Sequence, residues 1–332
     1  MRKQFVRLAT LGAALLFAQG ALAADRIAYG STAIGSVHYT YAVSAAKAIN
    51  THSADKVNVT VLATGGAVDN LARLARGQIN FGLGTFETVY QAYKGLAKFS
   101  GNPAPKLRIL WVHSASMQFY VVRADSGVKT LNDLTGKKFN AGQRGSATEN
   151  IVQQILAAVD VKPDYFVATL SDAVAAVKDG RSIGYTKAGS RTSLDGTTLE
   201  LRALTPISVI GFTPEQVAKV QAKLPYVAFA SIGPKSIEGV GAITTPVQTI
   251  GEFSYSDSLT DEQVMSMLDG LLKGQDVQAA AFPDMKGMDI IKESIAAAGA
   301  LELPLHSGAV KFFRARGYTV PDKLIPPEAK SK

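Results

Sequence analysis

Residues 56–76, with the sequence KVNVTVLATGGAVDNLARLAR, contain the pattern that decides the fold. Val57, Val59 and Val61 alternate with polar side chains, which predicts a half-buried β-strand. A glycine pair ends the strand, and the apolar side chains of residues 68–76 then recur at helical spacing. The order of strand, small polar loop and helix indicates one βα unit of a parallel sheet.

The same unit recurs on both sides of this stretch, in two series. The expected strands are residues 26–29, 79–83, 107–113, 119–123, 138–141 and 165–170, and the expected helices are 39–50, 87–94, one that begins near residue 146, and 172–178. Residues 243–256 read as extended and return toward the first series. This alternation predicts an α/β fold with mixed sheets flanked by helices.

Two series predict two lobes. We expect residues 24–114 together with 231–332 to form the first lobe, and residues 115–230 to form the second. The chain would then cross between the lobes twice, and the two crossings would act as a hinge. The ligand cleft is expected between the lobes, at the carboxyl ends of the strands.

The N-terminus predicts export. Arg2 and Lys3 precede an apolar run at residues 8–22, which ends in the small-residue pattern Ala21-Leu22-Ala23. These features are typical of a secretory signal peptide, here residues 1–23 with cleavage near Ala23, and they predict a periplasmic protein. An uncleaved membrane anchor is the alternative. The chain has no cysteine, which excludes a lipoprotein anchor and a disulfide framework.

Composition and spacing argue against an enzyme and against a nucleic-acid-binding protein. The net charge is +8, but no run of five or more basic residues occurs. The four histidines, His38, His52, His113 and His306, lack the spacing of metal ligands. No nucleophile elbow and no Walker lysine is present. We therefore expect no catalytic residue, no metal and no cofactor, and a periplasmic enzyme is the least favoured alternative.

Three polar loops stand directly before predicted helices, at residues 30–36, 64–66 and 145–148. Hydroxyl groups and free backbone N–H groups at a helix start bind carboxylates and phosphates. Helix capping and tight turns are the alternative for each loop. With further residues expected at the cleft, the candidate ligand-binding residues are Ser31, Thr32, Ser36, Thr64, Gly65, Gly66, Glu87, His113, Arg144, Gly145, Ser146, Thr148, Lys187 and Ser190.

A set of ordered motifs makes the chain resemble a known family. They are the strand and small-residue loop at 27–36, TGGAVDN at 64–70, ETVYQAYKG at 87–95, DLTGK at 133–137, GSAT at 145–148 and LPLHSGA at 303–309. In this order they resemble the TAXI family, the extracytoplasmic receptors of one class of TRAP transporters. The resemblance covers nearly the whole mature chain.

The resemblance implies a type II periplasmic-binding-protein fold that closes on its ligand. It also implies an integral-membrane TRAP permease as partner, ion-coupled uptake, and a carboxylate ligand of the glutamate or 2-oxoglutarate class. We expect the receptor to be monomeric. The leading hypothesis is thus a receptor for a small organic anion, and the alternative is the binding protein of an ABC-type importer or of a periplasmic sensing system.

The sequence departs from the family pattern at three places that we expect in the cleft. Residues 181–191 read RSIGYTKAGSR where the family has an apolar, aromatic segment. Arg144 stands where the family has a small residue or proline, and Ser114-Ala115-Ser116 replaces Tyr-Pro-Glu. The solute therefore need not be the family's usual one.

Four of the candidate ligand-binding residues each have two possible roles. Arg144 can pair with a ligand carboxylate or be a solvated loop arginine. Lys187 should face the cleft or solvent, because burial of an unpaired lysine is costly. Glu87 can bind a ligand amine or only favour the helix dipole. His113 can be a cleft donor or a satisfied core histidine.

Overall fold

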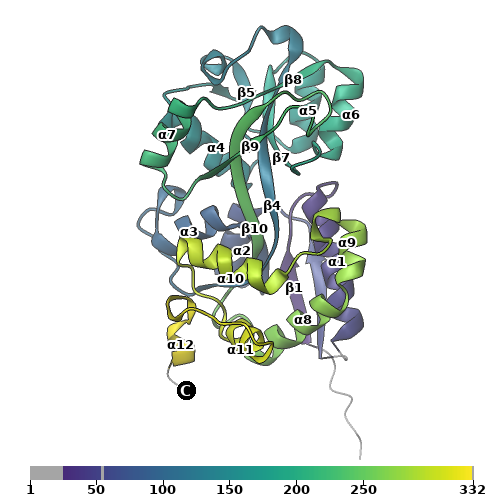
Figure 1. Ribbon diagram of the computed structural model, residues 1–332, viewed down its shortest axis with the longest axis vertical. Helices are drawn as coiled ribbons and strands as arrows, with labels where there is room; N and C mark the ends of the chain where they lie inside the picture. Colours follow the sequence, from purple (N-terminus) through teal and green to yellow (C-terminus); the bar gives the residue numbers. More distant parts are fainter. Residues whose placement is uncertain (1–24, 54–55, 331–332) are drawn as a thin grey trace, which may run out of the picture.

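The computed structural model describes residues 25–53 and 56–330 as two lobes stacked along the long axis of the molecule (Figure 1). The predicted signal peptide at residues 1–23 lies outside the described residues. Within the described part of the chain, no helix has both the length and the apolar character needed to cross a membrane.

A ten-stranded mixed sheet runs through both lobes, with the main strand order β2-β1-β3-β10-β4-β7-β5-β6. The strands are β1 Asp25–Gly30, β2 Val57–Leu62, β3 Phe81–Thr85, β4 Leu107–Arg123, β5 Lys138–Asn140, β6 Asp164–Tyr165, β7 Gly184–Gly189, β8 Ile207–Ile210, β9 Ala228–Ile232 and β10 Ile243–Tyr255. β1 pairs in parallel with β2 and β3, and β5 pairs in parallel with β6 and β7, as the βα units predict. β10 is antiparallel to β3, β4 and β9.

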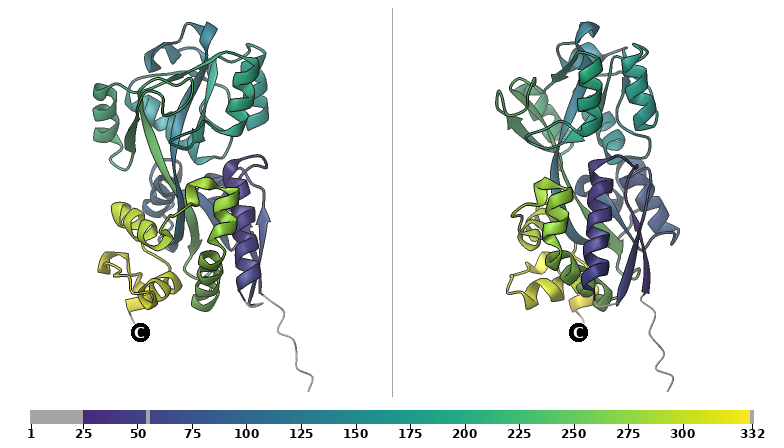
Figure 2. Two further views of the ribbon diagram at one scale, coloured as in Figure 1. Left: turned by 45° about the vertical axis from the view of Figure 1, so that its right-hand side comes forward. Right: turned by 90° about the vertical axis from the view of Figure 1, so that its right-hand side faces the viewer.

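Helices cover this sheet in both lobes (Figure 2). They are α1 Val37–His52, α2 Ala67–Ala75, α3 Phe86–Lys94, α4 Ala147–Ala158, α5 Leu170–Lys178, α6 Gly196–Leu204, α7 Pro214–Lys223, α8 Asp261–Lys273, α9 Gln275–Ala281, α10 Ile290–Leu301, α11 Ser307–Ala315 and α12 Pro327–Lys330. α4 to α7 belong to the upper lobe in Figure 1, and the other helices belong to the lower lobe.

Helix starts follow the capping residues in the sequence. Ser146 accepts a hydrogen bond from the backbone N–H of Glu149 at the start of α4, and a capping box of Thr260 and Gln263 opens α8. α5 begins at Leu170, two residues before the predicted helix at 172–178, because Thr169 is its N-cap. The expected strand at residues 165–170 is correspondingly reduced to the two residues of β6.

The hydrophobic cores show where the chain changes lobe. One core contains residues between Ile27 and Val112 and between Ile250 and Leu324. The other two cores contain only residues between Met117 and Val247. Residues 232–247, which the sequence interpretation assigned to the first lobe, therefore pack with the second, because β9 and β10 pair there and bury Ile232 and Val247.

β4 and β10 are the two connections between the lobes. The expected break at residues 114–116 is absent, and β4 continues through these serines as one 17-residue strand. The pairing of β4 with β10 is irregular at this level, since Ile250 pairs with Ser114 while Gly251 pairs with Val112. His113 is thus the extra residue of a β-bulge, a feature that bends a strand and re-aims its side chain. At Gly251 a Cβ atom would lie 2.3 Å from a backbone oxygen of β4, so only glycine fits there without a shift.

Candidate functional site

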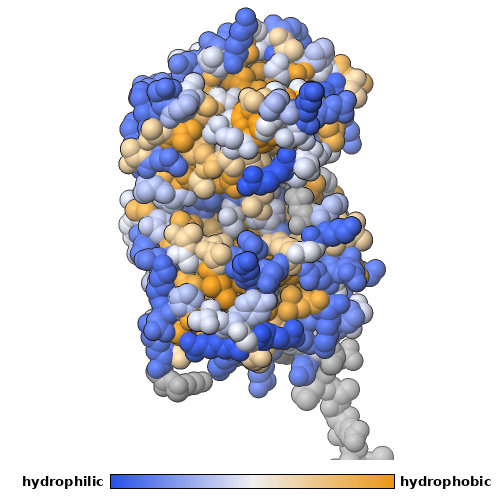
Figure 3. Space-filling view, viewed as in Figure 1, coloured by the Kyte–Doolittle hydropathy of each residue, from blue (hydrophilic) through white to orange (hydrophobic). Residues whose placement is uncertain are grey.

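A cavity of about 370 Å³ lies between the two lobes beside β4. This volume is within the range that binds small molecules. In the space-filling view of Figure 3 the molecule is narrower where the two lobes meet than in either lobe. From the lower lobe the cavity is lined by Val37, Thr40, Ala281, Phe282 and Pro283; from β4 and the upper lobe it is lined by Ser116, Gly189, Ser190, Thr192, Ser193, Leu194, Asp195, Gly196 and Leu199.

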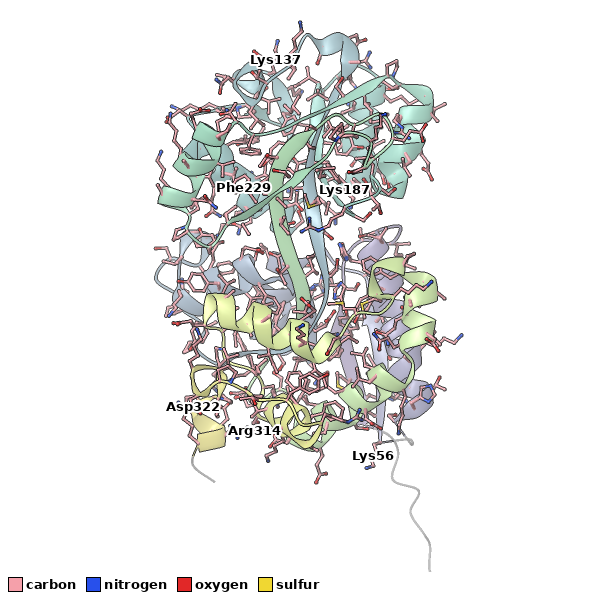
Figure 4. All side chains as sticks on the ribbon, viewed as in Figure 1. Lys56, Lys137, Lys187, Phe229, Arg314 and Asp322 are labelled. Carbon is pink, nitrogen blue, oxygen red and sulfur yellow. The ribbon has the colours of Figure 1, made fainter. Side chains whose placement is uncertain are left out.

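Lys187 supplies positive charge near this cavity. It lies on β7, is partly buried, and sits near the level where the lobes meet (Figure 4). Its charge acts on His38 of the lower lobe, where it contributes to a pKa well below the ordinary value of histidine, after burial and His113. Asp195 also lines the cavity, but its carboxylate accepts hydrogen bonds from Thr197 and Thr198 at the start of α6.

A row of buried polar side chains crosses the strands near the hinge. Gln118 is fully buried, and neither its amide nitrogen nor its amide oxygen has a partner among the described residues. The same holds for the hydroxyl of Thr186 and the amide nitrogen of Gln248. Gln118 is paired with Ala188 and Gln248 with Ser116, so these side chains are near neighbours across adjacent strands. Buried polar groups without partners are costly, which points to a molecule that satisfies them.

Glu87 lies at the start of α3, close to this row. Its Oε1 accepts a hydrogen bond from the backbone N–H of Thr249 at 3.4 Å, and Oε2 has no partner within the described chain. Burial raises the pKa of Glu87 to about 7. Near neutral pH this carboxyl group is therefore partly protonated and can either donate or accept a hydrogen bond.

The loops expected to bind an anion have most of their donors engaged within the protein. The hydroxyl of Thr64 donates to the Ser31 carbonyl, and Gly65 N–H donates to the Asp69 carboxylate at 3.0 Å. The N–H groups of Val68 and Asp69, at the start of α2, donate to the carbonyl of Gly145 in the other lobe at 3.1 and 3.3 Å. Next to them, Gly66 has a positive φ of 105°. The two loops therefore contact each other across the cleft.

The remaining candidates have mixed surroundings. Ser36 and Ser146 cap α1 and α4, as the alternative interpretation anticipated, and Glu149 accepts from Gly145 N–H at 2.7 Å. Ser190 lines the cavity and also accepts from the backbone of Thr192 and Ser193. Ser31 is buried with an unpartnered hydroxyl among the described residues, Thr32 and Thr148 are half-buried, and Arg144 is exposed.

Comparison with known proteins gives the family. Residues 27–317 match the model of the NMT1-like family. The chain belongs to the NMT1-like family.

Solved structures share the fold of this NMT1-like protein. The alkanesulfonate-binding protein of Xanthomonas axonopodis pv. citri, bound to MOPS, is 14% identical with a TM-score of 0.50, covering 92% of this chain and 97% of that one. The zinc-bound ligand-binding component of an ABC-type import system from Staphylococcus aureus is 11% identical with a TM-score of 0.51, covering 92% and 98%. A protein of Bordetella bronchiseptica RB50 is 15% identical with a TM-score of 0.51, covering 90% of each chain. The two-lobed α/β fold of periplasmic binding proteins is thus confirmed.

A buried aromatic and acidic cluster lies beneath the cavity of the NMT1-like protein. His113 is fully buried and stacks on Tyr41, with ring centroids 3.8 Å apart. Burial lowers the pKa of His113 to about 3. Glu252 of β10 is also fully buried, accepts a hydrogen bond from the Tyr29 hydroxyl at 2.7 Å, and has a pKa raised well above its usual range by burial.

Sequence reasoning missed His38, Gln118 and Gln248, and it placed Ser116 in the cleft without naming it as a ligand-binding residue. Gln118 and Gln248 lie on the crossing strands, where a polar residue in an alternating pattern is normally assigned to the solvent face. Because β4 and β10 are covered on both faces near the hinge, these polar side chains are buried instead. The serine-rich departure at residues 114–116 was the available signal, since it marked this segment as a cleft position.

Proposed function

We propose that this protein is a periplasmic solute receptor that encloses a small organic anion between its lobes and delivers it to a membrane transporter. The observation that carries the proposal is the interlobe cavity of about 370 Å³, with Lys187 nearby and residues of both lobes in its wall. A ligand held by both lobes stabilises the closed arrangement, because it contacts the two halves together only in that state. No turnover of the solute is expected.

The charge of the site supports an anion. Lys187 is the cation whose charge acts on His38 in the cleft, whereas the carboxylate of Asp195 is engaged by the N-terminus of α6. Hydroxyl groups of Ser116 and Ser190 lie in the cavity wall and can donate to a carboxylate or sulfonate. Arg144 stays a candidate for a ligand entering from solvent, because it is exposed beside the loop of Gly65.

A thermal-shift screen of the mature protein tests the proposal. Dicarboxylates, keto acids, amino acids and alkanesulfonates are compared with neutral sugars and polyamines at equal concentration. Because a ligand at 100 times its Kd adds about 2.7 kcal/mol to the free energy of unfolding, a binding anion should raise Tm by several degrees. A rise with neutral or cationic compounds alone would contradict the anion assignment.

The partner is proposed to be a TRAP-type permease, on the motifs shared with the TAXI family. The second candidate is an ABC-type importer, and the fold shared with the Staphylococcus aureus import component favours it. Uptake by cells that express the receptor with the permease encoded beside it distinguishes the two. Loss of uptake when ion gradients collapse at normal ATP supports the TRAP assignment, and loss on ATP depletion with gradients intact supports the ABC assignment.

A further inference from the structure

Four side chains form a continuous row from the buried interior of the lower lobe to the interlobe cavity. Glu252 Oε1 lies 3.0 Å from His113 Nδ1, and His113 Nε2 lies 3.3 Å from His38 Nδ1. His38 Nε2 lies 3.5 Å from the hydroxyl of Ser116, which lines the cavity. The row thus connects a carboxyl group with no exposed surface to the wall of the site.

Few charged groups act on this row. Glu252 faces the hydroxyl of Tyr29 from β1 and the indole of Trp111 from β4, and Tyr41 from α1 stacks on His113. His38 faces His113, the ring of Phe282 and the charge of Lys187 from β7. Burial raises the pKa of Glu252 and lowers those of both histidines. Both histidines are therefore neutral at neutral pH, and burial favours the neutral form of Glu252.

A neutral imidazole donates from one ring nitrogen and accepts at the other, so the row has two possible directions. When Glu252 holds the proton, it donates to His113, which donates to His38, which donates to Ser116. The hydroxyl hydrogen of Ser116 is then free for the cavity or for Ser114, whose hydroxyl lies 3.3 Å away. When Glu252 is ionised, every bond reverses, and the Ser116 hydrogen is used by His38.

The contact of Glu252 with His113 is bent, because the oxygen lies off the direction that a straight hydrogen bond from Nδ1 requires. At 3.0 Å two unprotonated acceptors would nevertheless repel each other. The contact is therefore favoured when either the carboxyl group or the ring nitrogen holds a proton.

We propose that Glu252 sets the direction of this row, and that its protonated form makes Ser116 a hydrogen-bond donor to the solute. Glu252, His113 and His38 act as positioning residues, and Ser116 is the group that touches the solute. The inference rests on the proposed function and deepens it, because a donating Ser116 selects a carboxylate or sulfonate oxygen over an N–H or ammonium group. Ionisation of Glu252 would remove that preference.

NMR of the mature protein with ¹⁵N-labelled histidine tests the direction without any ligand. Wild-type His113 and His38 are expected to be neutral at pH 7, with the hydrogen on Nε2, and to change to the Nδ1–H form as rising pH ionises Glu252. Glu252→Gln should keep Nε2–H at every pH, because its carboxamide N–H still donates to His113. Glu252→Met removes the ionisable group, so the tautomers of His113 and His38 should no longer change between pH 7 and pH 10.

The outcomes separate clearly. His38→Gln and His113→Gln assign the signals, and His52→Gln at the far end of α1 is the control that removes a signal without changing the others. A charged imidazole or Nδ1–H in the wild type at pH 7 would overturn the inference. So would wild-type tautomers that stay unchanged up to pH 10, a result that decides the matter even where Glu252→Met does not fold.

Calorimetry with L-glutamate, 2-oxoglutarate and methanesulfonate then tests whether Ser116 donates to a bound solute. For a probe that binds, Ser116→Ala should weaken affinity about fivefold, the effect of one neutral hydrogen bond. Wild-type affinity should fall at high pH, whereas that of Glu252→Gln should not. If none of these probes binds, the proposed ligand class fails, while the NMR result still decides the direction of the row.

Discussion

Replacement of Glu87 by glutamine should change how the stability of the protein depends on pH. Burial raises the pKa of Glu87 from an ordinary 4.5 to about 7 in the folded state. Between these values the folded protein binds a proton that the unfolded chain does not, so the favourable contribution is complete below pH 4.5 and is lost as pH rises through 7. At about 1.4 kcal/mol per tenfold change, wild type should lose roughly 2–3 kcal/mol between pH 5 and pH 8 through this group.

Glu87→Gln removes this ionisation while it keeps the size of the side chain. Urea unfolding of the mature protein is measured at pH 5, 6, 7 and 8. The free energy of unfolding of the variant, relative to that of wild type, should increase as pH rises. The difference in midpoint between wild type and variant should move by roughly 1 M across this range, given urea m-values of a few kcal/mol/M. Glu238→Gln, whose side chain is 94% exposed, is the control and should follow wild type at each pH. A constant difference between Glu87→Gln and wild type from pH 5 to pH 8 would refute the reasoning.

Three further substitutions test the site and the hinge. Lys187→Met should weaken binding of an anionic solute by about 10–100-fold in calorimetry, the range for a hydrogen bond to a charged group, while the exposed Lys178→Met should leave it unchanged. Gly251→Ala should lower the free energy of unfolding by about 2–4 kcal/mol in urea, because the added Cβ meets the backbone of β4, whereas Gly241→Ala has open space and should change it little. Gln118→Leu should keep or raise the stability of the ligand-free protein, since it removes an unpartnered buried amide, but should reduce solute affinity; a large loss of stability would instead assign Gln118 a structural role.

The sequence predicted the βα units and therefore the class of fold. Alternation at Val57, Val59 and Val61 and the small residues after each strand are local signals, and the structure forms β2 and α2 where they indicate. The cap at His306, whose ring nitrogen accepts from Gly308 N–H at 3.1 Å, is a local feature of the same kind. These features are determined by residues close to one another in the sequence, so local sequence patterns predict them.

The crossings between the lobes were harder to place, because they depend on pairing between distant segments. Ser114 and Ser116 read as a break in a strand, yet both are buried within β4. The bulge at His113 exists only because Gly251 and Ile250 skip a residue in the opposite strand. No spacing within β4 alone specifies that irregularity, and it is the feature that aims His113 at Glu252 and His38.

The same dependence explains why the anion loops alone do not define the solute site. Loops before helices carry free N–H groups in an isolated lobe, but here the start of α2 is occupied by the Gly145 carbonyl of the opposite lobe. A donor satisfied by the partner lobe favours closure and is no longer available to the solute. Selectivity must then come from groups that closure leaves without partners, and among the described residues around the crossing strands these include Gln118, Gln248, Thr186 and Glu87.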